Sequence, residues 1–300
     1  SNVEAGKRFG IPVLGTMAHS WVMSFDEEID AFREYVRQYH DNLILLADTY
    51  NVLEMGVPHA IQVFKELKEE GRLPGKYGIR IDSGDIAYLS QEATRMFTEA
   101  GFPDAIISGS NDLDEYTIQS LKAQGCTVTS WGVGTKIITA DGTSALGGVF
   151  KMAVKEADGK ELPVMKFSND VEKMTNPGIK TVYRFYKKDT GKMITDLVCL
   201  HDEKAADGGD FTLVTESAKW RRKELKAGTY TVEELLKPVV ENGRNLPLPA
   251  LSEIIRYADK QIDTLWPEYT RLLNPDLMEI NLSDKLQTLK SELIRRELGE

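Results

Sequence analysis

Short runs of apolar residues alternate with longer amphipathic stretches over the first half of the chain. The runs that we expect to form buried strands are Ile11–Leu14, Leu43–Ala47, Gly78–Ile81, Ala105–Ile107 and Val128–Ser130. The stretches between them, in which apolar residues recur at helical spacing, predict helices near Asp26–His40, Val57–Glu70, Ile86–Ala100 and Leu113–Gln124. Such alternation requires crossover connections and indicates a parallel sheet, either doubly wound or closed into a barrel. A sixth run, Gly147–Ala153, would continue the series.

The hydrophobic pattern changes in the second half of the chain. Thr181–Tyr186 alternates apolar and polar residues, and a turn separates it from Met193–Leu200, so the two segments predict a β-hairpin. The last part, Val232–Glu300, has mostly helical spacing. We therefore expect an α/β catalytic portion over residues 1–160 and a region of β-hairpin and helices over residues 161–300.

Composition and charge narrow the range of partners. The 300 residues carry a formal net charge of −10, which argues against nucleic acid, because a phosphate backbone requires a basic surface. A small phosphorylated ligand is still allowed, since backbone N–H groups and arginines bind phosphate in acidic proteins too. The two cysteines, Cys126 and Cys199, form no C-x-x-C pair and indicate a reducing cytoplasm. No apolar run reaches the roughly 18 residues of a membrane span, so no membrane partner is expected.

A polar motif follows each predicted strand of the first half. The motifs are Gly15–Trp21, Asp48–Asn51, Asp82–Asp85, Ser108–Asp112 and Trp131–Lys136. Arg80 lies inside the third strand. Because the carboxyl ends of parallel strands meet at one edge or mouth, we expect all five motifs to converge on one site.

Two of these motifs are glycine-containing turns and two contain acids. Ser108–Asn111 and Gly132–Thr135 expose backbone N–H groups of the kind that bind phosphate, although a simple tight turn has the same composition. Asp82 and Asp85 lie three apart, and such a pair holds sugar hydroxyls or Mg²⁺, or else caps a helix. Asp48 is open to the same alternatives of ligand and cap. Each motif is weak alone, and their convergence is what favours a phosphate-handling site.

His19 is the histidine that the pattern singles out. A lone histidine is usually structural, but His19 lies in the first strand-end motif, where it can shuttle protons or attack a phosphoryl group. His40 and His201 are expected at the surface, and His59 is expected to be exposed or to cap a helix. No H-x-x-x-H pair or Cys/His cluster indicates a zinc site.

The motifs, taken in order, resemble those of one enzyme family. Those that look like the barrel motifs of nicotinate phosphoribosyltransferase are Gly15–Trp21, Leu46–Asn51, Ile79–Asp85, Ser108–Glu115 and Trp131–Thr135, and Lys166–Arg184 is also similar to that family. The resemblance runs from Ser1 to about Leu200. The opening residues look like an internal segment of the family, so we expect the natural protein to begin upstream with an N-terminal α/β domain that this chain lacks.

The resemblance implies an irregular parallel β/α barrel of the type II phosphoribosyltransferase kind, with a C-terminal β-hairpin and helical appendage. It implies an enzyme that joins nicotinate to phosphoribosyl pyrophosphate, giving nicotinate mononucleotide and pyrophosphate in NAD biosynthesis. ATP hydrolysis is coupled to this reaction through a phosphohistidine, and His19 matches that position. The resemblance further implies Mg²⁺ at the departing pyrophosphate, with ligands that the sequence does not assign, and a homodimer that shares its site across the interface.

The strand-end motifs and the resemblance together assign roles to particular residues. Catalysis is expected of His19 and Asp82, and Arg80 and Asp82 match the ribose and pyridine end of the family's site. The residues expected to bind substrate are Thr16, Asp48, Arg80, Ser83, Asp85, Ser108, Gly109, Ser110, Asn111, Gly132, Gly134 and Thr135.

Three alternatives stay open from the sequence. The first is the related nicotinamide phosphoribosyltransferase, since the choice of base depends partly on residues outside this chain. The second is an aldolase-like barrel, which would need a Schiff-base lysine at the strand ends, where only Lys136 is available. The third is a sugar-phosphate-binding barrel remnant without activity.

Overall fold

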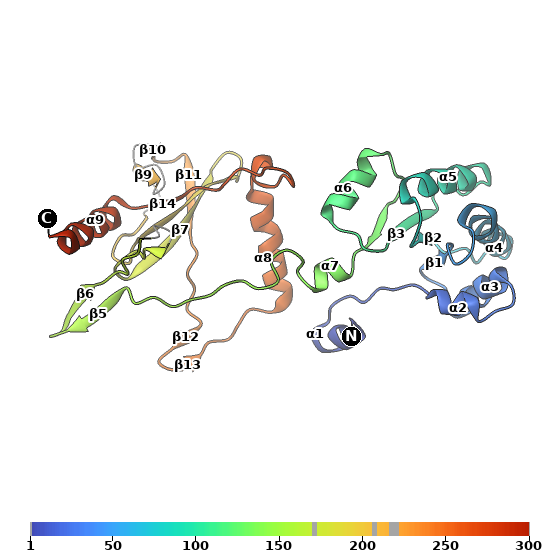
Figure 1. The fold of residues 1–300 in the computed structure, drawn as a ribbon, viewed down its shortest axis with the longest axis horizontal. Coiled ribbons are helices and arrows are strands. Elements are labelled where there is room, and N and C mark those ends of the chain that lie inside the picture. The colour runs from blue at the N-terminus through green and yellow to red at the C-terminus, as the bar shows by residue number, and fades with distance from the viewer. Residues whose placement is uncertain (1, 170–172, 206–208, 216–221, 300) are drawn as a thin grey trace. The chain divides into compact units, whose positions relative to one another are not determined.

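The computed structural model describes residues 2–169, 173–205, 209–215 and 222–299. The chain forms two compact units, Ser1–Gly147 and Gly148–Glu300, which are described separately (Figure 1). The family-like stretch Lys166–Arg184 belongs to the second unit, and residues 170–172 within it lie outside the described part.

A parallel four-stranded sheet, in the order β1-β2-β3-β4, forms the centre of the first unit. Its strands are β1 (Leu43–Leu46), β2 (Tyr77–Ile81), β3 (Ile106–Ser110) and β4 (Ser130–Gly132). The parallel sheet that the alternation predicts is therefore confirmed. The strand expected at Ile11–Leu14 is wrong, because residues 10–18 form neither helix nor strand. Pro12 has no N–H to donate to a ladder, and Leu14 is 80% exposed, so this segment has little to gain from pairing.

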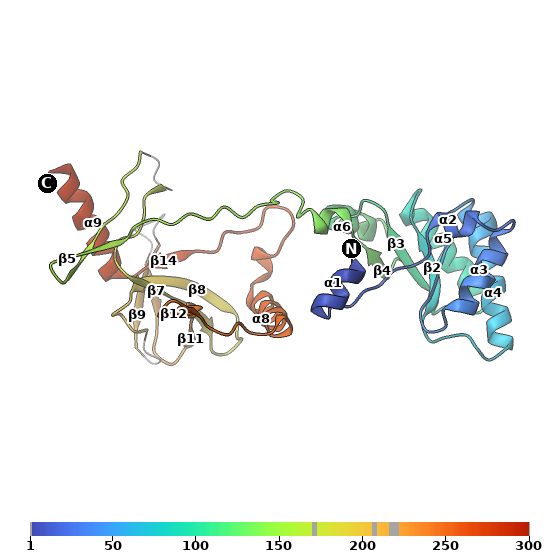
Figure 2. The same ribbon diagram turned by 90° about the horizontal axis from the view of Figure 1, so that it is seen from below.

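The first unit contains the four helices that the periodicity predicts, and also helical segments that it does not predict. They are α1 (Asn2–Phe9), α2 (His19–Met23), α3 (Glu28–Gln38), the π-helical turn η1 (Val52–Gly56), α4 (Val57–Glu69), α5 (Ile86–Glu99), α6 (Glu115–Ala123) and α7 (Thr135–Ile138). Helices α3, α4 and α5 pack beside the strands (Figure 2). Phe64 of α4 is fully buried there, with its ring 5.9 Å from that of Phe97 and 5.0 Å from that of Tyr77.

The two faces of this sheet differ in character. Ile79 and Ile107, which point to the helices, are buried in the hydrophobic core. Arg80 pairs in register with Ser108, and Ser108 pairs with Ser130, so these three residues share the opposite face. The sheet thus buries an apolar face and presents a polar row on the other.

A second, six-stranded sheet forms the centre of the second unit, in the order β10-β9-β14-β8-β7-β11. Its strands are β7 (Lys180–Lys187), β8 (Met193–Leu200), β9 (Phe211–Thr215), β10 (Arg222–Leu225), β11 (Tyr230–Glu234) and β14 (Ile280–Leu282). The antiparallel pair β7 and β8 confirms the predicted hairpin. Two small hairpins add β5 (Val154–Ala157) with β6 (Lys160–Pro163), and β12 (Val240–Glu241) with β13 (Arg244–Asn245).

Two expectations for the second half need correction. The tail is helical only at α8 (Leu251–Thr264), the 3₁₀ turn η4 (Pro267–Tyr269) and α9 (Asp284–Leu298). Strand β14 lies between them and pairs with both β8 and β9, a long-range contact that helical spacing cannot reveal. The sixth run, Gly147–Ala153, is not a strand, and its Phe150 is fully exposed, so no neighbouring surface buries its apolar side chains.

Candidate functional site

Arg80 is the centre of a hydrogen-bonded cluster at the ends of the parallel strands. Its guanidinium donates from Nε to Ser110 Oγ at 2.7 Å, from Nη1 to Thr16 Oγ1 at 2.9 Å and from Nη2 to Asp82 Oδ1 at 2.6 Å. The Ser110 hydroxyl donates to the same Asp82 oxygen. The Arg80 side chain, which comes from β2, therefore joins three residues that each belong to a different predicted motif.

Asp82 is held in its ionised form by these neighbours. Partial burial raises the pKa of this carboxyl, but the hydrogen bonds from Ser110 and Arg80, together with the Arg80 charge, lower it by more. The net pKa of Asp82 lies below its ordinary value. The site therefore offers a fixed negative charge beside a fixed positive one.

Asp48 supports the turn that carries Asp82. Its side chain is 1% exposed, and its Oδ2 accepts a hydrogen bond from the backbone N–H of Asp82 at 2.9 Å and from Ser83 Oγ at 2.6 Å. Asp85, at the end of the same turn, caps α5 by accepting from the Tyr88 N–H at 3.1 Å. Each acid was expected to be either a ligand or a helix cap. The hydrogen bonds make Asp85 a helix cap, whereas Asp48 stabilises the Asp82 turn from inside the site.

His19 lies against both acids at the start of α2. Its Nε2 is 3.5 Å from Asp82 Oδ2 and 3.9 Å from Asp48 Oδ1, while its Nδ1 is 3.1 Å from Thr49 Oγ1. The side chain is 41% exposed, so a ligand can reach it. Thr49, which follows Asp48 in the same strand-end motif, orients the ring by holding one of its nitrogens.

A cleft of about 580 Å³ runs along the polar face of the sheet, next to this cluster. The predicted substrate-binding residues that line it are Thr16, Arg80, Ser108, Ser110, Gly132 and Gly134. Ser130 and Trp131 line it too. Ser130 follows from the strand register, because it pairs with Ser108, whereas Trp131 belongs to the last strand-end motif. Gly109 points away, since a Cβ on it would meet Val128 at 3.3 Å. The other predicted residues do not line the cleft, and these are His19, Asp48, Asp82, Ser83, Asp85, Asn111 and Thr135.

The turn after β3 has an unusual backbone. Asn111 and Asp112 follow each other with φ angles of 81° and 43°, in the left-handed region that side-chain-bearing residues seldom adopt. Asn and Asp tolerate this region better than other residues with a Cβ. Strained turns of this kind are often found at ligand-binding sites, which agrees with the phosphate role predicted for Ser108–Asn111.

Gly84 permits the turn between Asp82 and Asp85, and this leads to a testable expectation. Its φ is +79°, and a Cβ there would lie 2.9 Å from Leu89 Cδ1. Gly84→Ala is therefore expected to lower the free energy of unfolding by about 1–2 kcal/mol, as measured by urea denaturation. Gly75→Ala is the matched control, because a Cβ there meets nothing within 4 Å. Equal stability of the two variants would contradict the assigned strain.

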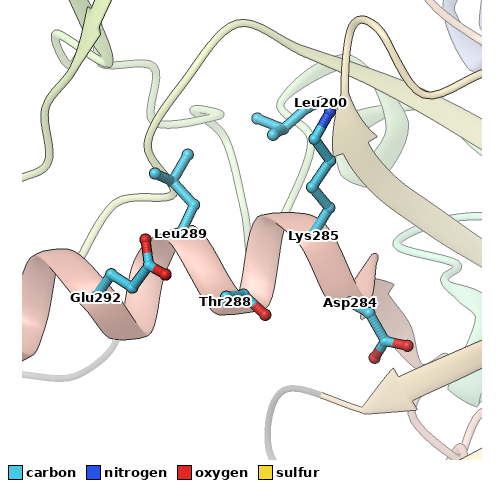
Figure 3. A pocket seen from close by; sticks show the side chains of 6 residues that line it. All are labelled: Leu200, Asp284, Lys285, Thr288, Leu289 and Glu292. Carbon is cyan, nitrogen blue, oxygen red and sulfur yellow. The ribbon is translucent and has the colours of Figure 1, made fainter.

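Outside the Arg80 cluster, the described residues offer fewer polar side chains that are free to bind a ligand. A hollow of about 460 Å³ in the second unit is lined by Leu200 of β8 and by side chains of α9. Figure 3 shows these side chains. Lys285 in this hollow is already paired with Asp202. Within the described ranges, no three His, Cys, Asp or Glu side chains gather as metal ligands. No helix in those ranges is both long and apolar enough to cross a membrane.

Sequence comparisons connect this site to a family. Residues 1–204 match the nicotinate phosphoribosyltransferase (NAPRTase) family, and residues 179–290 match the nicotinate phosphoribosyltransferase C-terminal domain. Nicotinate phosphoribosyltransferase from Bacillus subtilis (strain 168) is 39% identical over 298 residues, which cover 98% of this chain and 59% of that protein. Nicotinate phosphoribosyltransferase 2 from Arabidopsis thaliana is 32% identical, over 95% of this chain and 60% of that protein. The chain thus spans about 60% of the length of these relatives.

Structural comparisons agree with the sequence. The crystal structure of human nicotinic acid phosphoribosyltransferase is similar with a TM-score of 0.74 and 27% identity, over 97% of this chain and 64% of that one. A nicotinate-nucleotide pyrophosphorylase from Pyrococcus furiosus has a TM-score of 0.58 at 20% identity, over 87% of this chain and 57% of that one, which is a likeness of fold alone. From the match over residues 1–204 and the 39% identity over 98% of its length, the chain belongs to the nicotinate phosphoribosyltransferase family.

Proposed function

We propose that this chain carries the phosphoribosyl-transfer site of an ATP-coupled nicotinate phosphoribosyltransferase of the cytoplasm. The reaction would transfer the phosphoribosyl group of phosphoribosyl pyrophosphate to nicotinate, giving nicotinate mononucleotide and pyrophosphate. The observation that carries the proposal is the cluster of Arg80 with Thr16, Asp82 and Ser110, beside His19 and above a cleft of about 580 Å³.

The arrangement of charges suits displacement at the anomeric carbon of ribose. The transition state of that reaction resembles an oxocarbenium cation, and the ionised Asp82 provides negative charge beside Arg80, which lines the cleft. Arg80 and the neighbouring hydroxyls would hold the pyridine and ribose in line for the attack. The serine and glycine turns after β3 and β4 would hold the phosphates through their backbone N–H groups.

His19 is proposed as the acceptor of the γ-phosphoryl group of ATP. In that step the bond from the γ-phosphorus to the bridging oxygen breaks, a bond from phosphorus to a ring nitrogen forms, and ADP leaves. The ring proton would pass to solvent or to the carboxylates that face Nε2, at 3.5 Å from Asp82 and 3.9 Å from Asp48. A phosphoryl group here would lie next to the Arg80 cluster, which couples ATP use to substrate binding.

Mg²⁺ and a second subunit complete the proposal. The described residues show no three-ligand metal group, so they do not fit a protein-built Mg²⁺ cage, and we assign no step to the ion. Mg²⁺ would enter on the pyrophosphate oxygens with its own waters. We also propose a homodimer that shares its site across the interface between the two subunits.

The aldolase-like alternative is disfavoured by the surroundings of Lys136, the lysine that the sequence offers at the strand ends. Lys136 Nζ lies 2.6 Å from Asp141, and that pairing raises the pKa of the ammonium group. A Schiff-base lysine requires the opposite shift. Lys136 also does not line the cleft that contains Arg80.

The test is an assay with labelled nicotinate, phosphoribosyl pyrophosphate and ATP, run in parallel with nicotinamide. We expect nicotinate mononucleotide to form in preference to the nicotinamide product, with the family's N-terminal domain supplied if the chain alone does not turn over. Preference for nicotinamide would assign the related activity instead. Calorimetric binding of phosphoribosyl pyrophosphate without turnover, with the N-terminal domain present, would identify a binding protein and overturn the proposal.

A further inference from the structure

The cleft on the polar face of the first unit's sheet also contains an apolar row. Ile44 of β1 and Ile106 of β3 both line the cleft. Gly78 of β2 pairs in register with Ile44 on one side and with Ile106 on the other, so the three residues lie side by side across the sheet. A Cβ on residue 78 would lie 1.9 Å from the carbonyl oxygen of Ile106, so only glycine fits there. The two isoleucines therefore flank a position without a side chain, and such a row suits a flat apolar ring.

A positively charged residue lies on either side of this row. Lys76 directly precedes β2, and its carbonyl oxygen accepts a hydrogen bond from the Leu43 N–H at 3.0 Å, which continues the ladder to residue 76. Because side chains alternate along a strand, Lys76, Gly78 and Arg80 share one face, and the first and last of them are about 13 Å apart between Cα atoms. Lys76 and Arg80 both line the cleft.

The two positive charges differ in how they are compensated. Arg80 is paired with Asp82 at 2.6 Å. Lys76 is exposed, and its ammonium group makes no hydrogen bond or ion pair with any residue that the structure describes. No Asp or Glu of the described ranges lines the cleft. Lys76 therefore supplies a positive charge that is not compensated, which favours an anionic group at its end of the cleft.

We propose that Lys76 determines the choice of base, by binding the carboxylate of nicotinate while the pyridine ring lies against Ile44 and Ile106. In this orientation the ring nitrogen points toward Arg80 and its partner Asp82, where the transfer is proposed to take place. Nicotinamide has the same ring but no charge, so it gains far less from an ammonium group. The inference rests on the proposed function and adds the residue of this chain that selects the acid over the amide.

The first test compares nicotinate with nicotinamide as substrates of Lys76→Gln, with the family's N-terminal domain supplied where turnover requires it. We expect kcat/KM for nicotinate to fall by about 10- to 100-fold and that for nicotinamide to stay within about twofold, because a hydrogen bond to a charged partner is lost for the acid alone. The change should appear in KM rather than in kcat, since the contact is made in the bound substrate and in the transition state alike. Lys76→Arg keeps the charge and should retain most of the preference for nicotinate.

Two further variants separate the charge from its surroundings. Lys65→Gln removes the charge of an exposed lysine on α4 that does not line the cleft, and it is expected to leave the preference unchanged. Ile106→Ala widens the apolar row and should weaken both bases alike, because contact with the ring does not distinguish acid from amide. An unchanged ratio of nicotinate to nicotinamide turnover in Lys76→Gln would overturn the proposal and leave the proposed function standing.

The second test measures binding without turnover, by calorimetry on the 300-residue protein. Its probes are benzoate and benzamide, which carry the acid and the amide on a flat ring but have no ring nitrogen to attack ribose. We expect benzoate to bind more tightly than benzamide, and Lys76→Gln to remove the difference. This result in a protein that does not turn over nicotinate would refute the proposed function and still place the carboxylate at Lys76. Equal binding of the two probes, or binding of neither, would overturn the proposal.

Discussion

Replacing Arg80 with glutamine is expected to lower kcat/KM for phosphoribosyl transfer by about 10²–10³-fold. The change removes the charge-assisted hydrogen bond to Asp82 at 2.6 Å and those to Thr16 and Ser110. Removing one partner of a partly buried, hydrogen-bonded charge pair costs about 2–5 kcal/mol, which corresponds to a loss of about 30- to 5,000-fold, and the expected value lies in the middle of that range. Steady-state kinetics and calorimetric binding of phosphoribosyl pyrophosphate measure it.

A matched control for Arg80→Gln is available on α5. Arg95 also makes several hydrogen bonds to acids, Glu92 and Glu99, but it is exposed and remote from the cluster. Arg95→Gln is expected to leave the kinetics within about twofold, since exposed pairs contribute little. Arg80→Lys should recover only part of the rate, because an ammonium group cannot reach three acceptors in the geometry of a guanidinium. A folded Arg80→Gln protein with nearly unchanged kinetics would show that the cluster is structural.

Replacing His19 with alanine is expected to abolish incorporation of phosphate from ATP and the stimulation of the reaction by ATP. Loss of the nucleophile removes the acceptor atom, so labelling from γ-³²P-ATP should fall by at least about 100-fold. The ATP-independent transfer should persist at a reduced rate, because the Arg80 cluster does not depend on the imidazole for its hydrogen bonds.

His201→Ala is the control for His19→Ala, since His201 is exposed and belongs to the second unit. It should retain whatever labelling the unchanged protein shows. Full ATP stimulation in the His19 variant would exclude the phosphohistidine role and leave His19 as a group that orients Asp82. Thr49→Val, which removes the contact to Nδ1 at 3.1 Å, should reduce labelling without abolishing it.

Periodicity predicts the helices of the first unit well, and the strands less well, for a physical reason. The run expected at Ala105–Ile107 is observed as β3, Ile106–Ser110, and the run expected at Val128–Ser130 shares only its last residue with β4, Ser130–Gly132. Both strands extend beyond their apolar residues because one face of the sheet is polar. A search for apolar runs therefore ends a strand early wherever its other face belongs to a binding cleft.

From the sequence, the site could be predicted only as a set of motifs that converge at one edge of the sheet. The rule that parallel strands end at one edge brings together Arg80, Asp82 and Ser110, and the structure confirms that they meet. Thr16 meets them too, but from a segment that is not a strand. The rule does not tell which side chains bond to which. The buried contact between Glu28 and His59 could not be predicted from the sequence. An acid at the start of a helix usually faces solvent, and only tertiary packing buries this one.

The left-handed turn at Asn111 and Asp112 limits how this protein can vary over evolutionary time. Substitutions there are confined largely to Gly, Asn and Asp, since branched or bulky residues disfavour that backbone. The neighbouring surface, by contrast, is free to drift. In sequences of uncertain assignment, a valine or isoleucine at either position would indicate that the loop beyond β3 has been rebuilt and that its ligand has changed with it.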